Sequence, residues 1–68
     1  MFTADYVMEV LEKQPFIYER IKYGQVEVSI HHYQTEGLSD LLECLPGASI
    51  TYKGEAEEYF IYIVSNLS

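Results

Sequence analysis

The sequence contains few of the residues that stabilise very small proteins through special chemistry. Cys44 is the only cysteine, so one chain can form neither an internal disulfide nor a thiol-rich zinc site. No stretch approaches the ~20 consecutive apolar residues that a membrane-spanning helix needs. The N-terminus has no basic region followed by an apolar run, so we expect no signal peptide, no membrane association and a soluble cytoplasmic protein.

Basic residues are the second deficit. Four Lys and Arg residues oppose eleven Asp and Glu residues, which leaves a formal net charge of −7. Binding to nucleic acid requires a basic patch that displaces counterions from phosphates, so we expect no direct nucleic acid binding. The charged partner that suits this chain is a basic protein surface. The other interpretation is that the acidity only keeps a small apolar domain in solution.

Motifs of known enzymes are also absent. The sequence has no G-x-S-x-G, H-E-x-x-H, P-loop or dinucleotide-binding pattern. A chain of 68 residues has little interior from which to build a dry pocket. We therefore expect a non-enzymatic protein with no catalytic residue, no metal site and no cofactor.

His31 and His32 are the only imidazole pair. Neighbouring residues of a strand point to opposite faces, so these two side chains are poorly placed to chelate one metal ion. Two alternatives stay open. One is a Glu/His metal site between two copies, on the face that Glu27, Ser29 and His31 share. The other is an assembly that responds to pH through His31.

The most prominent feature that is present is a run of six β-branched or aromatic residues near the C-terminus. They are Tyr59, Phe60, Ile61, Tyr62, Ile63 and Val64. Alternate side chains of a strand point to opposite faces, so this strand is apolar on both of them. Such a strand needs cover on both faces. We therefore expect a central strand with helices on one side and a different surface on the other.

Two helices are predicted from residues that recur at helical spacing. The first covers residues 3–13, with Thr3 as its N-cap and Pro15 disfavouring helix beyond residue 13. The second follows a loop at residues 34–37 and ends at Pro46 and Gly47. Its apolar stripe, which we expect to lie on the sheet, is Leu38, Leu41, Leu42 and Leu45.

Residues 16–33 predict a hairpin whose two-residue loop is Tyr23–Gly24. This pairing sets Arg20 opposite Glu27 and leaves Glu19 opposite Val28, on the apolar face. An inward-pointing charge protects an edge strand from unwanted pairing, so we place residues 16–22 at an edge. A short strand at residues 48–53, an acidic turn at 54–57, the apolar strand within 58–65 and a tail at 66–68 complete the chain.

These elements predict a single small domain, residues 1–68, of the α+β class. The order is αββαββ, and the economical assembly packs both helices on one face of a four-stranded antiparallel sheet. The pattern Leu-Glu-x-x-Pro occurs at Leu11–Pro15 and again at Leu42–Pro46. This recurrence indicates a tandem αββ repeat with halves at 3–33 and 34–65; the alternative is that helix followed by proline recurs for physical reasons alone.

The sheet face opposite the helices has no element left to cover it. Contiguous exposed apolar surface marks interaction sites, and tyrosine is enriched at them. We therefore expect a protein–protein interaction or inhibitory protein that forms a homodimer through its apolar sheet face or a strand edge. The candidate interface residues are Tyr18, Tyr33, Tyr59, Phe60, Ile61, Tyr62, Ile63 and Val64.

Two other functions are compatible with the sequence. A monomeric inhibitor could imitate the phosphates of DNA and occupy a basic nucleic-acid-binding protein, as small acidic inhibitors carried by phages and other mobile elements do. Its acidic surface would be Asp40, Glu43, Glu55, Glu57 and Glu58. The third hypothesis is a small enzyme or ligand-binding dimer with a site where the subunits meet. The two leading hypotheses differ in salt dependence, because a complex held by charge weakens steeply with ionic strength.

Overall fold

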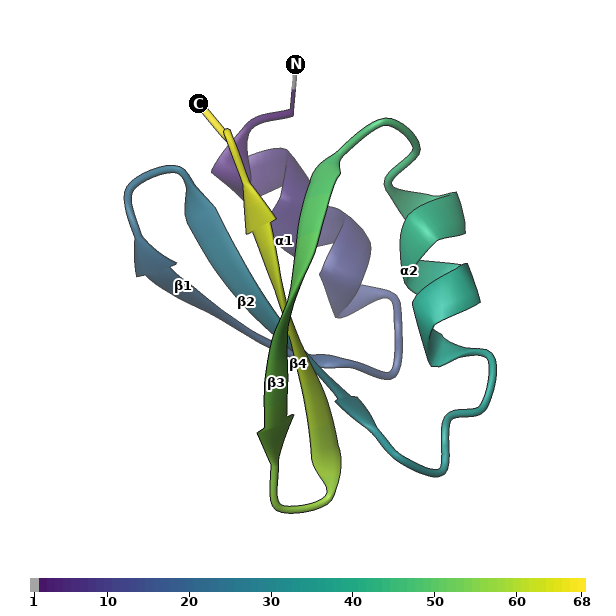
Figure 1. Ribbon diagram of the computed structural model, residues 1–68. Coiled ribbons are helices and arrows are strands. Elements are labelled where there is room, and N and C mark those ends of the chain that lie inside the picture. Colours follow the sequence, from purple (N-terminus) through teal and green to yellow (C-terminus); the bar gives the residue numbers. More distant parts are fainter. Residues whose placement is uncertain (1) are drawn as a thin grey trace.

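The computed structural model describes residues 2–68 and arranges them as two helices and one four-stranded antiparallel sheet (Figure 1). The elements in chain order are α1 (Ala4–Glu12), β1 (Ile17–Lys22), β2 (Gln25–His31), α2 (Gly37–Cys44), β3 (Ser49–Ala56) and β4 (Tyr59–Ser65). The α+β class and the order αββαββ are confirmed. Each half of the chain contains one αββ unit, and the tandem repeat itself stays a prediction.

The sheet has the strand order β1-β2-β4-β3. Each of the two hairpins therefore supplies one edge strand and one central strand, and β2 and β4 meet in the middle in antiparallel pairing. This confirms that the apolar run at residues 59–64 is a central strand and that residues 16–22 lie at an edge.

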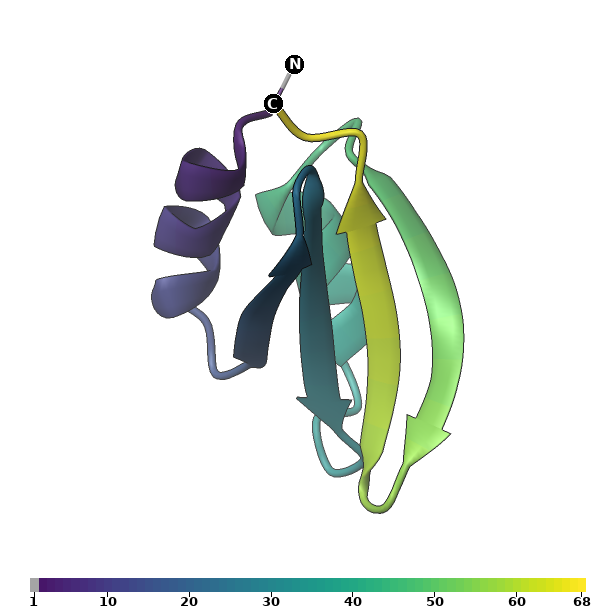
Figure 2. The ribbon, with the colours of Figure 1, turned by 90° about the vertical axis from the view of Figure 1, so that its left-hand side faces the viewer.

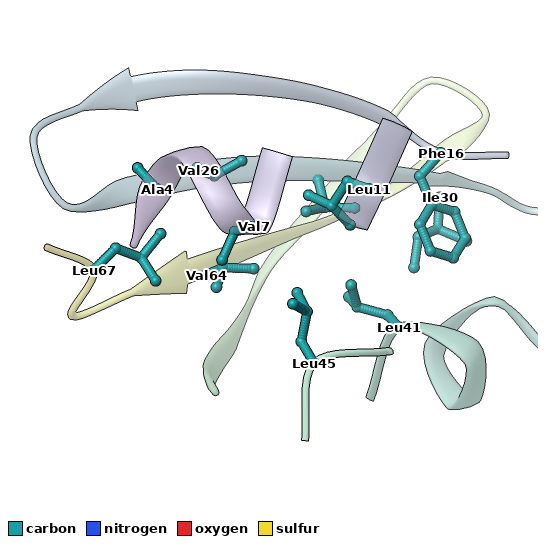
Figure 3. Packing of buried hydrophobic residues seen from close by; sticks show 11 residues of the cluster. Ala4, Val7, Leu11, Phe16, Val26, Ile30, Leu41, Leu45, Val64 and Leu67 are labelled. Atoms are coloured by element: carbon teal, nitrogen blue, oxygen red, sulfur yellow. The ribbon is translucent and has the colours of Figure 1, made fainter. Parts of the chain in front are cut away.

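Both helices pack against the same face of the sheet (Figure 2). Figure 3 shows the side chains that meet there from α1, α2, β2, β4 and the C-terminal tail. The buried apolar residues are Ala4, Val7, Leu11, Phe16, Val26, Val28, Ile30, Leu41, Leu45, Val64 and Leu67. This single cluster is the core, and its β2 members alternate with half-buried polar residues, as a strand with one wet face requires.

Helix α1 forms where its local signals place it. The backbone N–H of Tyr6 donates to the Thr3 hydroxyl at 3.1 Å, so Thr3 is the N-cap. Val7 and Leu11 are buried against the sheet. The helix ends at Glu12 with Lys13 as its C-cap, two residues before Pro15.

Helix α2 is rotated relative to the prediction. Leu41 and Leu45 are buried, but Leu38 and Leu42 are 42% and 50% exposed, so the expectation that all four leucines cover the sheet was wrong. Gly37, the first residue of α2, lies so close to Ile30 that an added Cβ would overlap the Ile30 Cγ2 methyl group. The buried face is therefore centred on Gly37 and Leu41. Leu38 and Leu42, the residues that follow them, lie about 100° further round the helix and are partly exposed for that reason.

The predicted register of the first hairpin was also wrong. Lys22 does pair with Gln25 across the Tyr23–Gly24 turn, but a bulge at Ile21 shifts the rest of β1 by one residue. A one-residue shift exchanges the two faces of a strand. As a result Tyr18, and not Glu19, lies opposite Val28, while Glu19 pairs with Glu27.

The second hairpin extends beyond its predicted length. Strand β3 continues to Ala56, so Gly54–Ala56 belong to the strand and the turn is Glu57–Glu58. A bulge at Lys53 and the positive φ of Gly54 (144°) allow the strand to pass the predicted turn. The predicted tail at residues 66–68 packs against the domain: Leu67 is buried, and its N–H donates to the Gly24 carbonyl at 3.1 Å.

Candidate interaction surface

The two faces of β4 have different surroundings. Phe60, Tyr62 and Val64 pair with Ile30, Val28 and Val26 of β2, so they face the helices. Tyr59, Ile61 and Ile63 pair with His31, Ser29 and Glu27 and lie on the face of the sheet that carries no helix. We call this surface the open face.

The remaining candidate interface residues are divided between the two sides. Tyr18 packs against the core on the helix side. Tyr33 lies beyond the end of β2 and is 86% exposed; its ring centroid is 4.8 Å from that of His31. The open face therefore brings together Tyr59, Ile61 and Ile63, with Tyr33 near one end of this apolar row.

Ile17 is an exposed residue of the open face. It pairs with Ser29 at the β1 edge and is 55% exposed. The predicted register, with Glu19 opposite Val28, implies that Ile17 lies opposite Ile30 on the buried side, and the bulge at Ile21 moves it to the other face. The spacing of apolar residues does not predict this bulge. Ile17 and Ile21 are favourable strand residues whether or not a bulge lies between them and the turn.

A shallow hollow lies beside Ile61 on the open face. It has a volume of about 280 Å³, and its lining residues are Glu27, Lys53, Gly54, Glu55, Ala56 and Ile61. The hollow exists because the β3 residues next to Ile61 and Tyr59 are Gly54 and Ala56, which have small side chains or none. At the same level across the sheet, Ile17, Ser29, Ile61 and Gly54 form one row from edge to edge.

The open face carries little of the protein's negative charge. Of the eleven acidic residues, the register places Glu19 and Glu27 on it, and the Glu58 carboxylate lies at its end, 3.3 Å from the His31 Nε2. The Lys53 ammonium reaches across β4 and donates to the Glu27 carboxylate at 2.9 Å. Glu19 stands directly opposite Glu27, a pairing of like charges that disfavours the strand pair. Within residues 2–68, no ion pair of Glu19 is recorded.

The other acidic residues lie on the helices, near their ends and at the tip of the second hairpin. Of the predicted acidic surface, Asp40 and Glu43 are exposed on α2, and Glu57 occupies the turn with a positive φ of 55°. Glu55 and Glu58 each lie 3.3 Å from a histidine Nε2, that of His32 and His31 respectively. The five candidates therefore form two groups rather than one continuous array.

His31 is the last residue of β2 and His32 follows it, and the two rings pack against different aromatic side chains. His31 packs edge-on against Tyr59, with ring centroids 5.1 Å apart, and its Nδ1 accepts the Tyr33 backbone N–H at 3.2 Å. His32 packs against Phe60 at 4.4 Å. Among the described residues no group of three or more His, Cys, Asp or Glu side chains is placed to hold a metal ion.

Cys44 is half-buried and its thiol donates to the Leu41 carbonyl at 3.2 Å. Burial, and to a smaller extent the Asp40 carboxylate, raise the pKa of the Cys44 thiol above its ordinary value of 9.0. A raised pKa keeps the thiol protonated near neutral pH, and the protonated form is a poor nucleophile. Cys44 therefore behaves as a small packing residue.

Comparisons with other proteins add nothing to this geometry. No protein-family model matches the chain, and neither a curated protein nor a solved structure does. None of the described helices has the length and apolar character needed to cross a membrane. Function is therefore argued from the surfaces described above.

Proposed function

We propose that this protein is a non-enzymatic interaction protein that acts as a homodimer through its open face. The observation that supports this function is that β4 is apolar on both faces while the two helices cover only one. Tyr59, Ile61 and Ile63 are partly shielded by the neighbouring strands, and Ile17 is more than half exposed. An apolar row of this kind gains free energy when a second surface removes it from water.

The distribution of charge favours a second copy as the occupant. Two chains that each carry a net charge of −7 repel one another, and the repulsion is smallest where the acidic residues are fewest. That region is the open face, where Lys53 offsets one of the two carboxylates that the register places there. A strongly basic protein would instead be drawn to the helices and the hairpin tip.

The size of the face sets the expected affinity. Four strands spaced ~4.8 Å apart and about six residues long give a face of roughly 20 by 20 Å. Two such faces bury roughly 800 Å² in total, below the ~1,200 Å² at which stable specific interfaces begin and in the range of weak, transient contacts. We therefore expect a dimer that dissociates at micromolar concentrations rather than an obligate one.

Light scattering over a concentration series, from about 1 to 500 μM around the expected affinity, tests the proposal. The protein should shift from a monomer to twice the chain mass. The variant Ile61→Thr/Ile63→Thr keeps β-branched side chains but makes the face polar, so it should remain monomeric and folded. Leu42→Gln changes a more exposed apolar position on α2; it is the control for loss of surface hydrophobicity and should dimerise normally.

A monomeric mass for the native protein at every concentration would contradict the homodimer. Dimerisation of the Ile61→Thr/Ile63→Thr variant with unchanged affinity would show that another surface joins the copies. Circular dichroism of each variant separates a lost interface from a lost fold.

A second candidate function is inhibition of a basic protein through the acidic surface. It is supported by the exposure of Asp40, Glu43 and Glu57, which lie away from the open face. A complex of this kind should weaken steeply between low and moderate salt, whereas the open-face dimer should not. The same scattering series at two salt concentrations, repeated with a basic partner, therefore distinguishes the two functions.

A further inference from the structure

We propose that, in the homodimer, the two open faces pack around a two-fold axis that runs parallel to the strands, between β2 and β4. This arrangement lays β1 of one copy over β3 of the second copy, and β2 over β4. The inference rests on the proposed function, because it describes how the open faces meet. It identifies Ile17, Glu19 and Lys53 as the residues that determine the geometry.

Two symmetric arrangements are available to a pair of stacked sheets. With a two-fold axis parallel to the strands, the strand order is reversed from one copy to the other, so each edge strand covers the opposite edge strand. With an axis perpendicular to the strands but still between the sheets, each strand covers its own counterpart. The residues of the open face decide between these arrangements.

The shape of the open face favours the parallel axis. Ile17 projects from β1, and the hollow beside Gly54 and Ala56 lies at the same level on β3. The parallel axis places Ile17 of one copy over the hollow of the second copy, and it places Ile61 over Ser29, a small residue. The perpendicular axis keeps β1 over β1 and β3 over β3, so Ile17 cannot fill the hollow of the second copy, and the unfilled space forfeits the contacts of its lining.

The charges of the open face favour the same axis. Glu19 lies opposite Glu27 within one chain, and the nearest cation of the face, Lys53, sits on the far edge strand, bound to Glu27. Laying β1 over β3 brings Lys53 of the second copy to Glu19. An ammonium group has three donors, so Lys53 can serve Glu27 of its own chain and Glu19 of the other. The perpendicular axis gives Glu19 no such partner.

A charge-swap experiment tests the arrangement. Glu19→Lys places two lysines together at each of the two contacts, and Lys53→Glu places two glutamates there, so each variant should weaken its own dimer about tenfold or more. Glu19→Lys also removes the like-charge pairing with Glu27 and should not destabilise the monomer. An equimolar mixture of the two variants should form a heterodimer tighter than either variant's own dimer, because both contacts between the copies then join opposite charges.

Thiol crosslinking provides a second, independent readout. In a Cys44→Ser background, a mixture of Glu19→Cys and Thr51→Cys chains, whose positions share one level of the sheet, should be joined by a short bismaleimide that spans the ~10 Å between stacked sheets. Glu19→Cys alone should not crosslink, because the parallel axis separates the two β1 strands by about three strand spacings, ~14 Å, in addition to the distance between the sheets. The perpendicular axis keeps β1 over β1 and away from β3, so the mixed crosslink would not form.

The outcomes separate this inference from the function on which it rests. A native protein that is monomeric at all concentrations refutes both. A native dimer whose two charge variants fail to form a heterodimer, or whose Glu19→Cys chains crosslink with themselves rather than with Thr51→Cys chains, leaves the homodimer standing and overturns the arrangement. Heterodimer formation together with the crosslink between positions 19 and 51 supports it.

Discussion

Replacing Gly37 with alanine tests whether a backbone contact holds α2 against the sheet. Gly37 is buried at the start of α2, and an added Cβ would overlap the Cγ2 methyl of Ile30 and lie 3.4 Å from the Gln34 Cβ. Ile30 is itself only 2% exposed and belongs to the core, so it has little space into which to move. Either the helix must shift outward or the isoleucine must leave its preferred rotamer.

Two opposing effects set the magnitude. Overpacking of a core by a single methyl group costs about 1–3 kcal/mol. Alanine also has a higher helix propensity than glycine, by up to ~1 kcal/mol in a helix interior and by less at a first helical residue. The net loss should be about 1–2 kcal/mol, which lowers the Tm of so small a domain by roughly 5–15 °C.

Urea and thermal unfolding followed by circular dichroism measure this loss, and a double-mutant cycle identifies its cause. Ile30→Leu removes the methyl group on Cβ that the alanine would strike. In that background Gly37→Ala should be neutral or slightly stabilising, because only the propensity gain remains. Ser39→Ala, at an exposed position of α2, is the control and should change stability by no more than about 0.5 kcal/mol. An equal loss in both Ile30 backgrounds would refute the steric explanation.

Two further predictions concern the contribution of the C-terminal residues to stability and the loss of stability at alkaline pH. Leu67→Ala should lower the free energy of unfolding in urea by about 2–4 kcal/mol, because it empties a buried site. Ser68→Ala, at the adjacent exposed position, should lower it by less than ~0.5 kcal/mol. Similar losses for both variants would mean that the tail contributes only its backbone hydrogen bonds. Burial raises the pKa of Cys44 above 9.0 and that of Tyr62 above 10.0. The native state therefore favours the neutral forms, and stability should decline as pH rises from about 9 upward. Urea midpoints between pH 7 and 11 should fall less in Cys44→Ser/Tyr62→Phe than in the native protein, and identical slopes would rule out these two groups as the cause.

Much of the architecture is encoded in local signals. Thr3 and Pro15 bound α1, Gly24 provides the turn of the first hairpin, and the run from Tyr59 to Val64 favours a strand that is apolar on both faces. Each of these features depends on a few neighbouring residues, so the elements, their order and the central position of β4 could be predicted without the tertiary structure.

The bulges could not be predicted in the same way. Ile21 and Lys53 are ordinary strand residues, and an extra residue at either place changes no local preference. The effect of a bulge appears only in the pairing of the strands. The bulge at Ile21 moves Ile17 and Glu19 to the open face. The rotation of α2 has a similar origin. It depends on the contact between Gly37 and Ile30 of β2, a residue outside the helix whose position the helical spacing of α2 does not predict.

The amino-acid pattern alone predicts that β4 is apolar on both faces, but it does not predict which face the helices cover. The two faces of β4 are almost equally apolar, so the strand has no preference of its own. The preference comes from β2, whose valines and isoleucine alternate with polar residues. Pairing β4 with β2 aligns Phe60, Tyr62 and Val64 with the apolar side of β2 and leaves Tyr59, Ile61 and Ile63 beside its polar side. The helices cover the side that is apolar on both strands, because burial there removes the most apolar surface from water.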